Sequence, residues 1–255
     1  CPLPPMIARS RMVPGGILRA AVLAGCVAGA QPPLCTITAG ITPLAGVGEA
    51  SGAAVSRRTP GILWSHNDSG RASLFAFDNT GNARGRVELT GVSIDDWEDL
   101  AAGSCPEGSC LYIADIGDNN RVRPGITIYR VPEPRPDDQT TKPAEAWTMT
   151  YPDGPHDAET LFAASGGQLF LVSKEDARTT ALYRVPATSG SGIGKLQQVA
   201  QLPLERVTGG AASPDGDWVA LRTNTDLLFY PAADLIVGKN VQPRRFDLKP
   251  LKERQ

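Results

Sequence analysis

The tetrapeptide Tyr129-Arg130-Val131-Pro132 recurs as Tyr183-Arg184-Val185-Pro186, and this repetition is the strongest indication of the fold. Each copy ends a mixed strand that follows a more apolar one. The same pair of strands occurs four times along the chain. The pairs are 62–65 with 74–77, 111–114 with 126–129, 169–172 with 181–184, and 218–221 with 227–230. A unit repeated in this way indicates a repeat architecture.

A small-residue strand precedes each pair and a more polar strand follows it. The small strands are expected at 51–56, 98–102, 159–164 and 208–213, and the polar ones near 87–89, 147–150, 196–202 and 244–248. This gradient is typical of a β-propeller blade, whose inner strand is crowded at the axis and whose outer strand faces water. We therefore predict an all-β protein with four legible four-stranded blades over 46–248 and a tail over 249–255. An all-β sandwich is the alternative.

Composition supports a globular domain and excludes several classes of protein. The 255 residues are 41% hydrophobic, and 25 basic against 27 acidic side chains give a net charge of −2. This balance excludes the basic footprint of a nucleic-acid-binding protein and the composition of a disordered chain. No apolar run reaches the ~18 residues of a membrane helix. We expect a monomer without a nucleic-acid partner or a transmembrane helix.

The first 35 residues resemble an export signal and linker. Three arginines lead into a short apolar stretch, 20–27, which small residues follow. Cleavage after Ala30 would give a secreted protein, whereas the string 23–26 resembles a bacterial lipobox, in which Cys26 is lipidated. We expect a secreted protein or a cell-envelope lipoprotein. A disordered Ala/Gly-rich start is the alternative.

Two cysteines are placed for a disulfide. Cys105 and Cys110 bracket the turn-forming sequence Pro-Glu-Gly-Ser between two apolar runs. A turn brings its flanking residues close together, as a disulfide requires, and an exported protein meets an oxidising compartment. We predict this bond in a hairpin of the second blade, with two free thiols as the alternative. The chain has no cysteine spacing typical of a zinc site.

Polar strings precede the inner strands and follow the second strands. In an up-and-down blade these points lie at the same edge, so the strings should surround one mouth of the central channel. We expect five carboxylates to point into one cavity: Asp96, Glu98, Asp115, Asp157 and Glu159. The expected edge of this cavity is His66, Asn67, His156 and Lys174. Glu98 and Glu159 should be equivalent, with Ser51 and Gly209 in the first and fourth blades. Arg222 should end its second strand as Asn67 and Asp115 do.

These side-chain types favour a hard cation. Ca²⁺ takes about 6–8 oxygen ligands, and the candidates here are Asn67, Asp96, Glu98, Asp115, Asp157 and Glu159. The candidate catalytic groups are His66, His156 and Lys174, with Glu98 and Glu159 as further acids or bases. A small anionic ligand would suit the side of the mouth near Lys174 and Arg222. The alternative is that these groups cap their own turns or form a solvated ion-paired lining.

The chain also resembles a family of exported, mostly uncharacterised bacterial β-propeller proteins. The resemblance spans 46–230 and rests on 63–70, Asp-Trp-Glu-Asp at 96–99, Asp-Ile-Gly-Asp-Asn at 115–119, Val-Pro-Glu-Pro at 131–134, 157–159 and 213–216. It implies five or six blades, so we expect a ring truncated near Gln255. The chain is more distantly similar to calcium-dependent propeller phytases and esterase-like proteins. Two functions stay open: a binding protein for a small anion or a cell-envelope component, or a metal-dependent hydrolase of phosphate esters, other esters or lactones.

Overall fold

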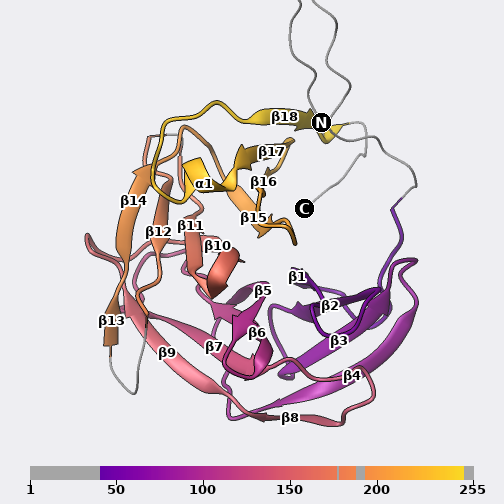
Figure 1. The fold of residues 1–255 in the computed structure, drawn as a ribbon. Helices are drawn as coiled ribbons and strands as arrows, with labels where there is room; N and C mark the ends of the chain where they lie inside the picture. The colour runs from indigo at the N-terminus through magenta and orange to yellow at the C-terminus, as the bar shows by residue number, and fades with distance from the viewer. Residues whose placement is uncertain (1–40, 177, 188–192, 250–255) are drawn as a thin grey trace, which may run out of the picture. The chain divides into compact units, whose positions relative to one another are not determined.

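Four sheets stand around a ring in the computed structural model, which describes residues 41–176, 178–187 and 193–249 (Figure 1). This confirms the predicted all-β propeller of four blades. The expected signal segment 1–35 with Cys26, and the tail beyond Lys249, lie outside the described residues. Among those described, no helix has the length and apolar character needed to span a membrane.

Each blade contains the four antiparallel strands that the sequence predicts. Blade one is β1 (Ala50–Val55), β2 (Ile62–Asn67), β3 (Ser73–Asp78) and β4 (Ala83–Thr90). Blade two is β5 (Trp97–Cys105), β6 (Gly108–Asp115), β7 (Ile126–Pro132) and β9 (Glu145–Thr150). Blade three is β10 (Ala158–Ala163), β11 (Leu169–Ser173), β12 (Ala181–Arg184) and β14 (Gln197–Gln201). Blade four is β15 (Val207–Ala212), β16 (Trp218–Thr223), β17 (Asp226–Pro231) and β18 (Arg244–Asp247). The described residues also form two short helices, η1 (Ser165–Gly167) and α1 (Ala232–Leu235).

The core lies between neighbouring blades rather than inside one of them. Trp64 and Leu111 belong to a cluster between blades one and two, Tyr112 and Leu161 to one between blades two and three, and Leu221 to one between blades three and four. Apolar sheet faces packed in this way supply most of the stabilisation, at about 25 cal/mol per Å² of buried apolar surface.

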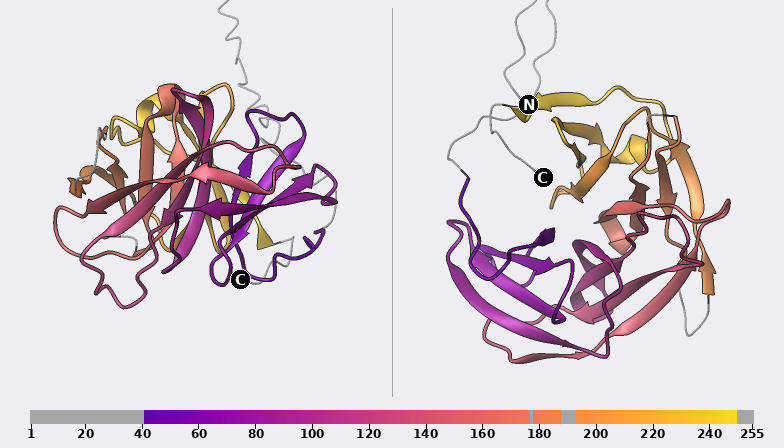
Figure 2. Two further views of the ribbon diagram at one scale, coloured as in Figure 1. Left: turned by 90° about the horizontal axis from the view of Figure 1, so that it is seen from below. Right: turned by 180° about the vertical axis from the view of Figure 1, so that it is seen from behind.

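The ring is packed at three of its four junctions. Inner strand β1 contacts β5, β5 contacts β10, and β10 contacts β15. In the part of the chain that is described, no apolar cluster joins blade four to blade one, and Val55 on β1 is 63% exposed. Seen from behind, β15 and β1 stand further apart than other neighbouring inner strands (Figure 2). The ring is therefore poorly closed, as expected, while blades beyond the fourth stay a prediction.

Two short strands that the sequence did not predict link one blade to the next. β8 (Thr140–Pro143) leaves blade two and pairs in parallel with β4, while β13 (Ile193–Lys195) leaves blade three and pairs in parallel with β9. Each covers the outer edge of the preceding blade, where unpaired backbone groups would otherwise be open to another chain. Their sequences, TTKP and IGK, lack the apolar alternation that signals a strand.

Glu133 ties blade one to blade two at the end of the channel where β1 ends. Its buried carboxylate accepts hydrogen bonds from Trp64 Nε1 at 3.0 Å, from Ser109 Oγ at 2.5 Å and from Ser56 Oγ. The backbone N–H groups of residues 57 and 58 donate to its Oε2 at 3.2 and 3.1 Å. This one side chain therefore satisfies donors from three separate segments.

The predicted disulfide is present in the same region. Cys105 ends β5 and Cys110 lies in β6, and the bond between them spans Cα atoms 5.8 Å apart across the hairpin turn. The prediction of a Cys105–Cys110 bond in the second blade is confirmed.

Candidate functional site at the channel mouth

A β-bulge opens the inner strand of every blade. The ladder between inner and second strands skips one residue after Ala50, Trp97, Ala158 and Val207. The four extra residues are Ser51, Glu98, Glu159 and Thr208. A bulge leaves its extra residue outside the ladder and re-aims the side chain, which is why bulges are frequent beside functional sites. The equivalence of Glu98 and Glu159 is thus built into the backbone.

The structure corrects the expected register of the fourth blade. The residue equivalent to Glu98 is Thr208 rather than Gly209, because Gly209 already pairs with Arg222. The residue that pairs with the start of the inner strand is Thr223, so Arg222 lies one position earlier than Asn67 and Asp115 do in their blades. The bulge explains the error, since it inserts a residue that an alignment of apolar patterns does not register.

The bulge residues interact with groups from neighbouring strands around the channel. Ser51 Oγ donates to Glu98 Oε2 at 2.9 Å, and Lys174 Nζ forms an ion pair with Glu159 Oε1. In blade four, Arg222 Nη1 donates to Thr208 Oγ1 at 3.2 Å. We call the end of the channel that holds Asp96, Glu98, Asp157 and Glu159 the channel mouth. Asp96 and Glu98 both lie beside Gly117, and Asp157 binds the N–H of the next residue, Asp118.

Burial and mutual repulsion raise the pKa of Glu98, Glu159 and Asp96. Burial, followed by the negative charge of Glu159, raises the pKa of Glu98 to about 8. Burial also raises the pKa of Glu159, although Lys174 opposes the change, and that of Asp96, although Arg123 opposes it. Burial lowers the pKa of Lys174, but the hydrogen bond to Glu159 and the negative charges of the surrounding carboxylates together outweigh it, and the net shift is upward. The mouth therefore holds more carboxylates than its neighbouring cations, Lys174 and Arg123, can neutralise.

Gly117 lets two of the carboxylates converge. A Cβ atom at this position would lie 2.6 Å from Glu98 Oε1 and closer still to Asp96 Oδ2, nearer than any real contact. Only glycine permits so close an approach of backbone to side chain. The two oxygen atoms therefore share a small space above the Gly117 backbone.

Asp115 and Asp157 hold the loops that surround the mouth. Asp115 accepts hydrogen bonds from the N–H groups of Asp95 and Asp96 at 3.0 and 3.2 Å, and from Arg123 Nη2 at 2.7 Å. Asp157 Oδ1 accepts from the Asp118 N–H at 2.9 Å. These bonds fix the backbone that carries Asp96 and Gly117, so the two carboxylates position the mouth.

Three other candidate residues, Asn67, His66 and His156, bind groups other than the four carboxylates. Asn67 Oδ1 accepts from the Glu49 N–H at 3.0 Å, at the start of blade one. His66 was expected at the edge of the mouth, but it is fully buried with its ring edge-on to Trp97. Its Nδ1 lies 2.9 Å from the Asn67 carbonyl oxygen. Burial lowers its pKa, although this bond and the charge of Asp68 oppose the change, and the neutral imidazole is favoured.

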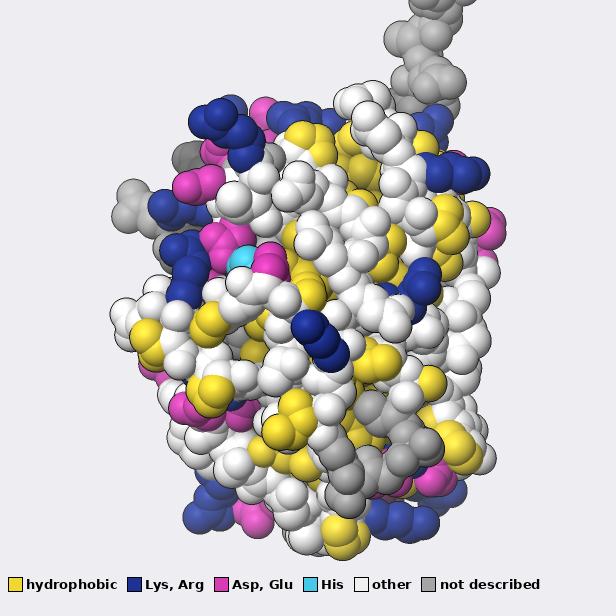
Figure 3. Space-filling model, turned by 90° about the vertical axis from the view of Figure 1, so that its left-hand side faces the viewer, with side chains coloured by type: hydrophobic (Ala, Val, Ile, Leu, Met, Phe, Trp, Pro, Cys, Tyr) yellow, Lys and Arg dark blue, Asp and Glu magenta, His cyan; other side chains and the backbone are white. Residues whose placement is uncertain are grey.

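His156 forms a separate cluster on the same rim. Its Nδ1 lies 3.2 Å from Glu175 Oε1 and its Nε2 lies 3.0 Å from Asp153 Oδ1. Arg121 pairs with the same Glu175, and Tyr151 packs edge-on against the imidazole. Figure 3 shows one histidine at the surface between acidic side chains, which is His156 because His66 is buried.

Ligand atoms at the mouth do not form a closed metal cage. Across the described ranges, the one set of three ligand-type side chains whose atoms lie within 4.8 Å of one another is Cys105, Glu107 and Cys110. Its cysteines are joined in the disulfide, so their sulfur atoms are not metal ligands. A cation at the mouth would therefore bind to a subset of the carboxylates and complete its coordination with water or a ligand.

Two residues of the mouth escaped the sequence analysis. Asp99 is fully enclosed and binds the Leu100 N–H at 2.8 Å and the Leu161 N–H at 2.7 Å, which joins β5 to β10. Asp68 Oδ1 is buried without a hydrogen-bond partner, and its charge acts on Asp96. The acidic motif at 96–99 contains both Glu98 and Asp99. The β-bulge at Glu98 gives the two side chains different roles, because Asp99 bridges β5 and β10 while Glu98 belongs to the channel mouth.

Comparisons with known proteins extend to the fold alone. Similar structures are hydrazine synthase of Kuenenia stuttgartiensis (15% identity, TM-score 0.46), an auxiliary nutrient binding protein of Bacteroides ovatus (12%, 0.44) and virginiamycin B lyase of Staphylococcus aureus (10%, 0.40). The matches cover 84, 72 and 78% of this chain but 53, 38 and 69% of those chains. The chain thus spans about half the length of the first. No family model matches, and no curated protein is similar. At these values the likeness carries no argument about ligand or activity.

Proposed function

We propose that this chain is an exported binding protein whose channel mouth takes a calcium ion. The observation that carries the proposal is the convergence of Asp96 Oδ2 and Glu98 Oε1 above Gly117. Two buried carboxylates brought together repel each other unless one keeps its proton or a cation lies between them. Carboxylate oxygens are the ligands that Ca²⁺ prefers.

The residues that would hold the ion are drawn from Asp96, Glu98, Asp157 and Glu159. Among the described residues no three carboxylates bring ligand atoms within 4.8 Å of one another, so the ion would bind a subset of the four. Of the about 6–8 positions of Ca²⁺, several would stay open for water or for an oxygen of the bound partner. An open position on a cation suits an anionic partner, either a small molecule or a cell-envelope component. Export itself rests on the predicted signal over 1–35.

Calorimetric titration with Ca²⁺ tests the proposal. Because Glu98 keeps its proton near neutral pH, binding should release protons, and the heat measured should differ between buffers of different ionisation enthalpy. Glu98→Gln and Glu159→Gln should each weaken binding at least tenfold. Glu88→Gln, which removes an exposed carboxylate paired with Arg71 on the outer strand, is the matched control and should bind as the wild type does. Absence of binding to the wild type, or equal binding by all three variants, contradicts the proposal.

A metal-dependent hydrolase is the second candidate, and the pKa of Glu98 favours it. A carboxyl that titrates near 8 can exchange protons with a substrate close to neutral pH. With an open position on the metal, such a site needs no nucleophilic side chain. Assays on phosphate monoesters, carboxylic esters and lactones, with Ca²⁺ and with EDTA, separate the two candidates. Turnover that requires Ca²⁺ and is lost in Glu98→Gln would establish the hydrolase. If none of these substrates is turned over, the binding protein is the function that stands.

A further inference from the structure

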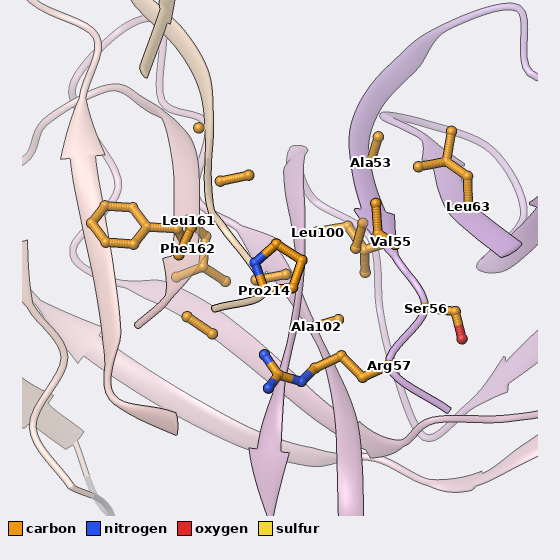
Figure 4. A pocket seen from close by; sticks show the side chains of 16 residues that line it. Ala53, Val55, Ser56, Arg57, Leu63, Leu100, Ala102, Leu161, Phe162 and Pro214 are labelled. Carbon is orange, nitrogen blue, oxygen red and sulfur yellow. The ribbon is translucent and has the colours of Figure 1, made fainter. Parts of the chain in front are cut away.

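The channel below the mouth contains an apolar cavity of about 410 Å³. Residues of all four inner strands line it, among them Ala53, Leu100, Leu161 and Ala211, with Phe162 on one side (Figure 4). Its volume falls within the ~300–1,000 Å³ of small-molecule sites. Small side chains near the axis leave this space open, and the lining offers few hydrogen-bonding groups besides those at one end.

That end carries a cation without a partner. Arg57 follows β1, so it lies at the end of the strand opposite to Ser51 and the channel mouth. No hydrogen bond or ion pair joins its guanidinium to another side chain of the described ranges, although its backbone N–H is held by Glu133 at 3.2 Å. Figure 4 shows the guanidinium reaching across the end of the cavity below Pro214.

The surroundings of Arg57 add positive charge. A second cavity of about 670 Å³ shares Arg57 and is also lined by Arg58 and Lys142. Glu133 and Glu107 belong to this lining too, but the Glu133 carboxylate is saturated by internal donors and buried, and Glu107 pairs with Arg130 at 3.5 Å. The apolar cavity thus opens at a basic end, while the acidic mouth lies at the other end of the inner strands.

We propose that the channel binds a small amphipathic anion, independently of any cation at the mouth. The apolar body of this ligand lies against the walls formed by β1, β5, β10 and β15. Its carboxylate, sulfonate or phosphate group faces the Arg57 guanidinium, whose planar fork can donate two parallel hydrogen bonds to such a group.

A matched pair of fluorescent probes tests this inference. 8-Anilinonaphthalene-1-sulfonate has an apolar body and an anionic group, and N-phenyl-1-naphthylamine is the same body without the sulfonate. The wild type should bind both. Arg57→Gln should weaken binding of the sulfonate about tenfold to a hundredfold, as loss of a charge-assisted hydrogen bond does, and leave the neutral probe unchanged. Arg71→Gln, which removes an exposed arginine that lines neither cavity, is the matched control and should change neither affinity.

A second variant places the probe inside the channel. Val55 lines the cavity and is 63% exposed, so Val55→Glu should fold and should repel the sulfonate probe strongly. Cooperative urea unfolding of each variant shows that the probe reports on native protein rather than on a loosened state. Equal sulfonate affinity in wild type and Arg57→Gln, or unchanged affinity in Val55→Glu, overturns the inference.

Discussion

Replacement of Glu98 by glutamine should remove an effect of pH on stability that arises at the channel mouth. The pKa of Glu98 is raised from 4.5 to about 8 in the folded protein. Between these two values the folded protein keeps a proton that the unfolded chain has released. The wild type therefore loses stability as the pH rises through this window, by up to ~1.4 kcal/mol per pH unit. The loss is complete above the folded-state pKa.

Solvent at the mouth screens part of this effect, so we expect roughly 2–3 kcal/mol between pH 5 and pH 9. The amide introduced by Glu98→Gln would keep an oxygen that accepts from Ser51 and would carry no charge at any pH. Glu98→Gln should therefore match the wild type near pH 5 and exceed its unfolding free energy by roughly 2 kcal/mol at pH 9.

Urea unfolding followed by circular dichroism, with EDTA present to remove cations, measures both curves. The other carboxylates of the mouth are present in both proteins, so the difference between the curves reports Glu98 together with its charge coupling to them. Equal m values show that the two proteins expose the same surface on unfolding. Parallel curves from pH 5 to pH 9 would refute the reasoning.

Three further predictions concern the rest of the chain. Glu133→Ala should lower the unfolding free energy by about 2–6 kcal/mol, because at least two buried donors lose their acceptor, and a loss in urea unfolding below about 1 kcal/mol would contradict this. The double variant Cys105→Ser/Cys110→Ser should lose less than the ~3 kcal/mol of a 15-residue loop, and a larger loss would show that the bond does more than close its turn. Mass spectrometry of the mature protein should find an N-terminus near Cys26 or Gln31, and an intact chain retaining the residues before Cys26 would exclude export.

The blade pattern is predictable from the sequence because each strand of a propeller has its own environment. β11 is wholly buried and reads as a continuous apolar run, while β18 faces water and reads as a polar one. Such contrasts survive in the sequence and repeat with the blades. β8 and β13 are different, since they are held by parallel pairing with a neighbouring blade rather than by their own side chains.

The site is predictable only in outline. The up-and-down topology brings the starts of inner strands and the ends of second strands to one edge of each blade. This rule correctly predicted that Glu98 and Glu159 occupy equivalent positions. His66 lies at the same edge, near the end of β2, but its side chain points into the core. Side chains alternate between the two faces of β2, and His66 belongs to the buried face. The bulges that separate Glu98 from Asp99, and Thr208 from Gly209, depend on backbone pairing and leave no clear mark in the residue types.

Anomalous scattering from crystals grown with Ca²⁺ locates the ion itself. We expect an anomalous peak at the channel mouth, about 2.3–2.6 Å from oxygen atoms of Asp96 and Glu98, that disappears in Glu98→Gln. A mouth without a peak in the wild type, or a peak held only by exposed carboxylates elsewhere on the surface, would contradict the proposed calcium site.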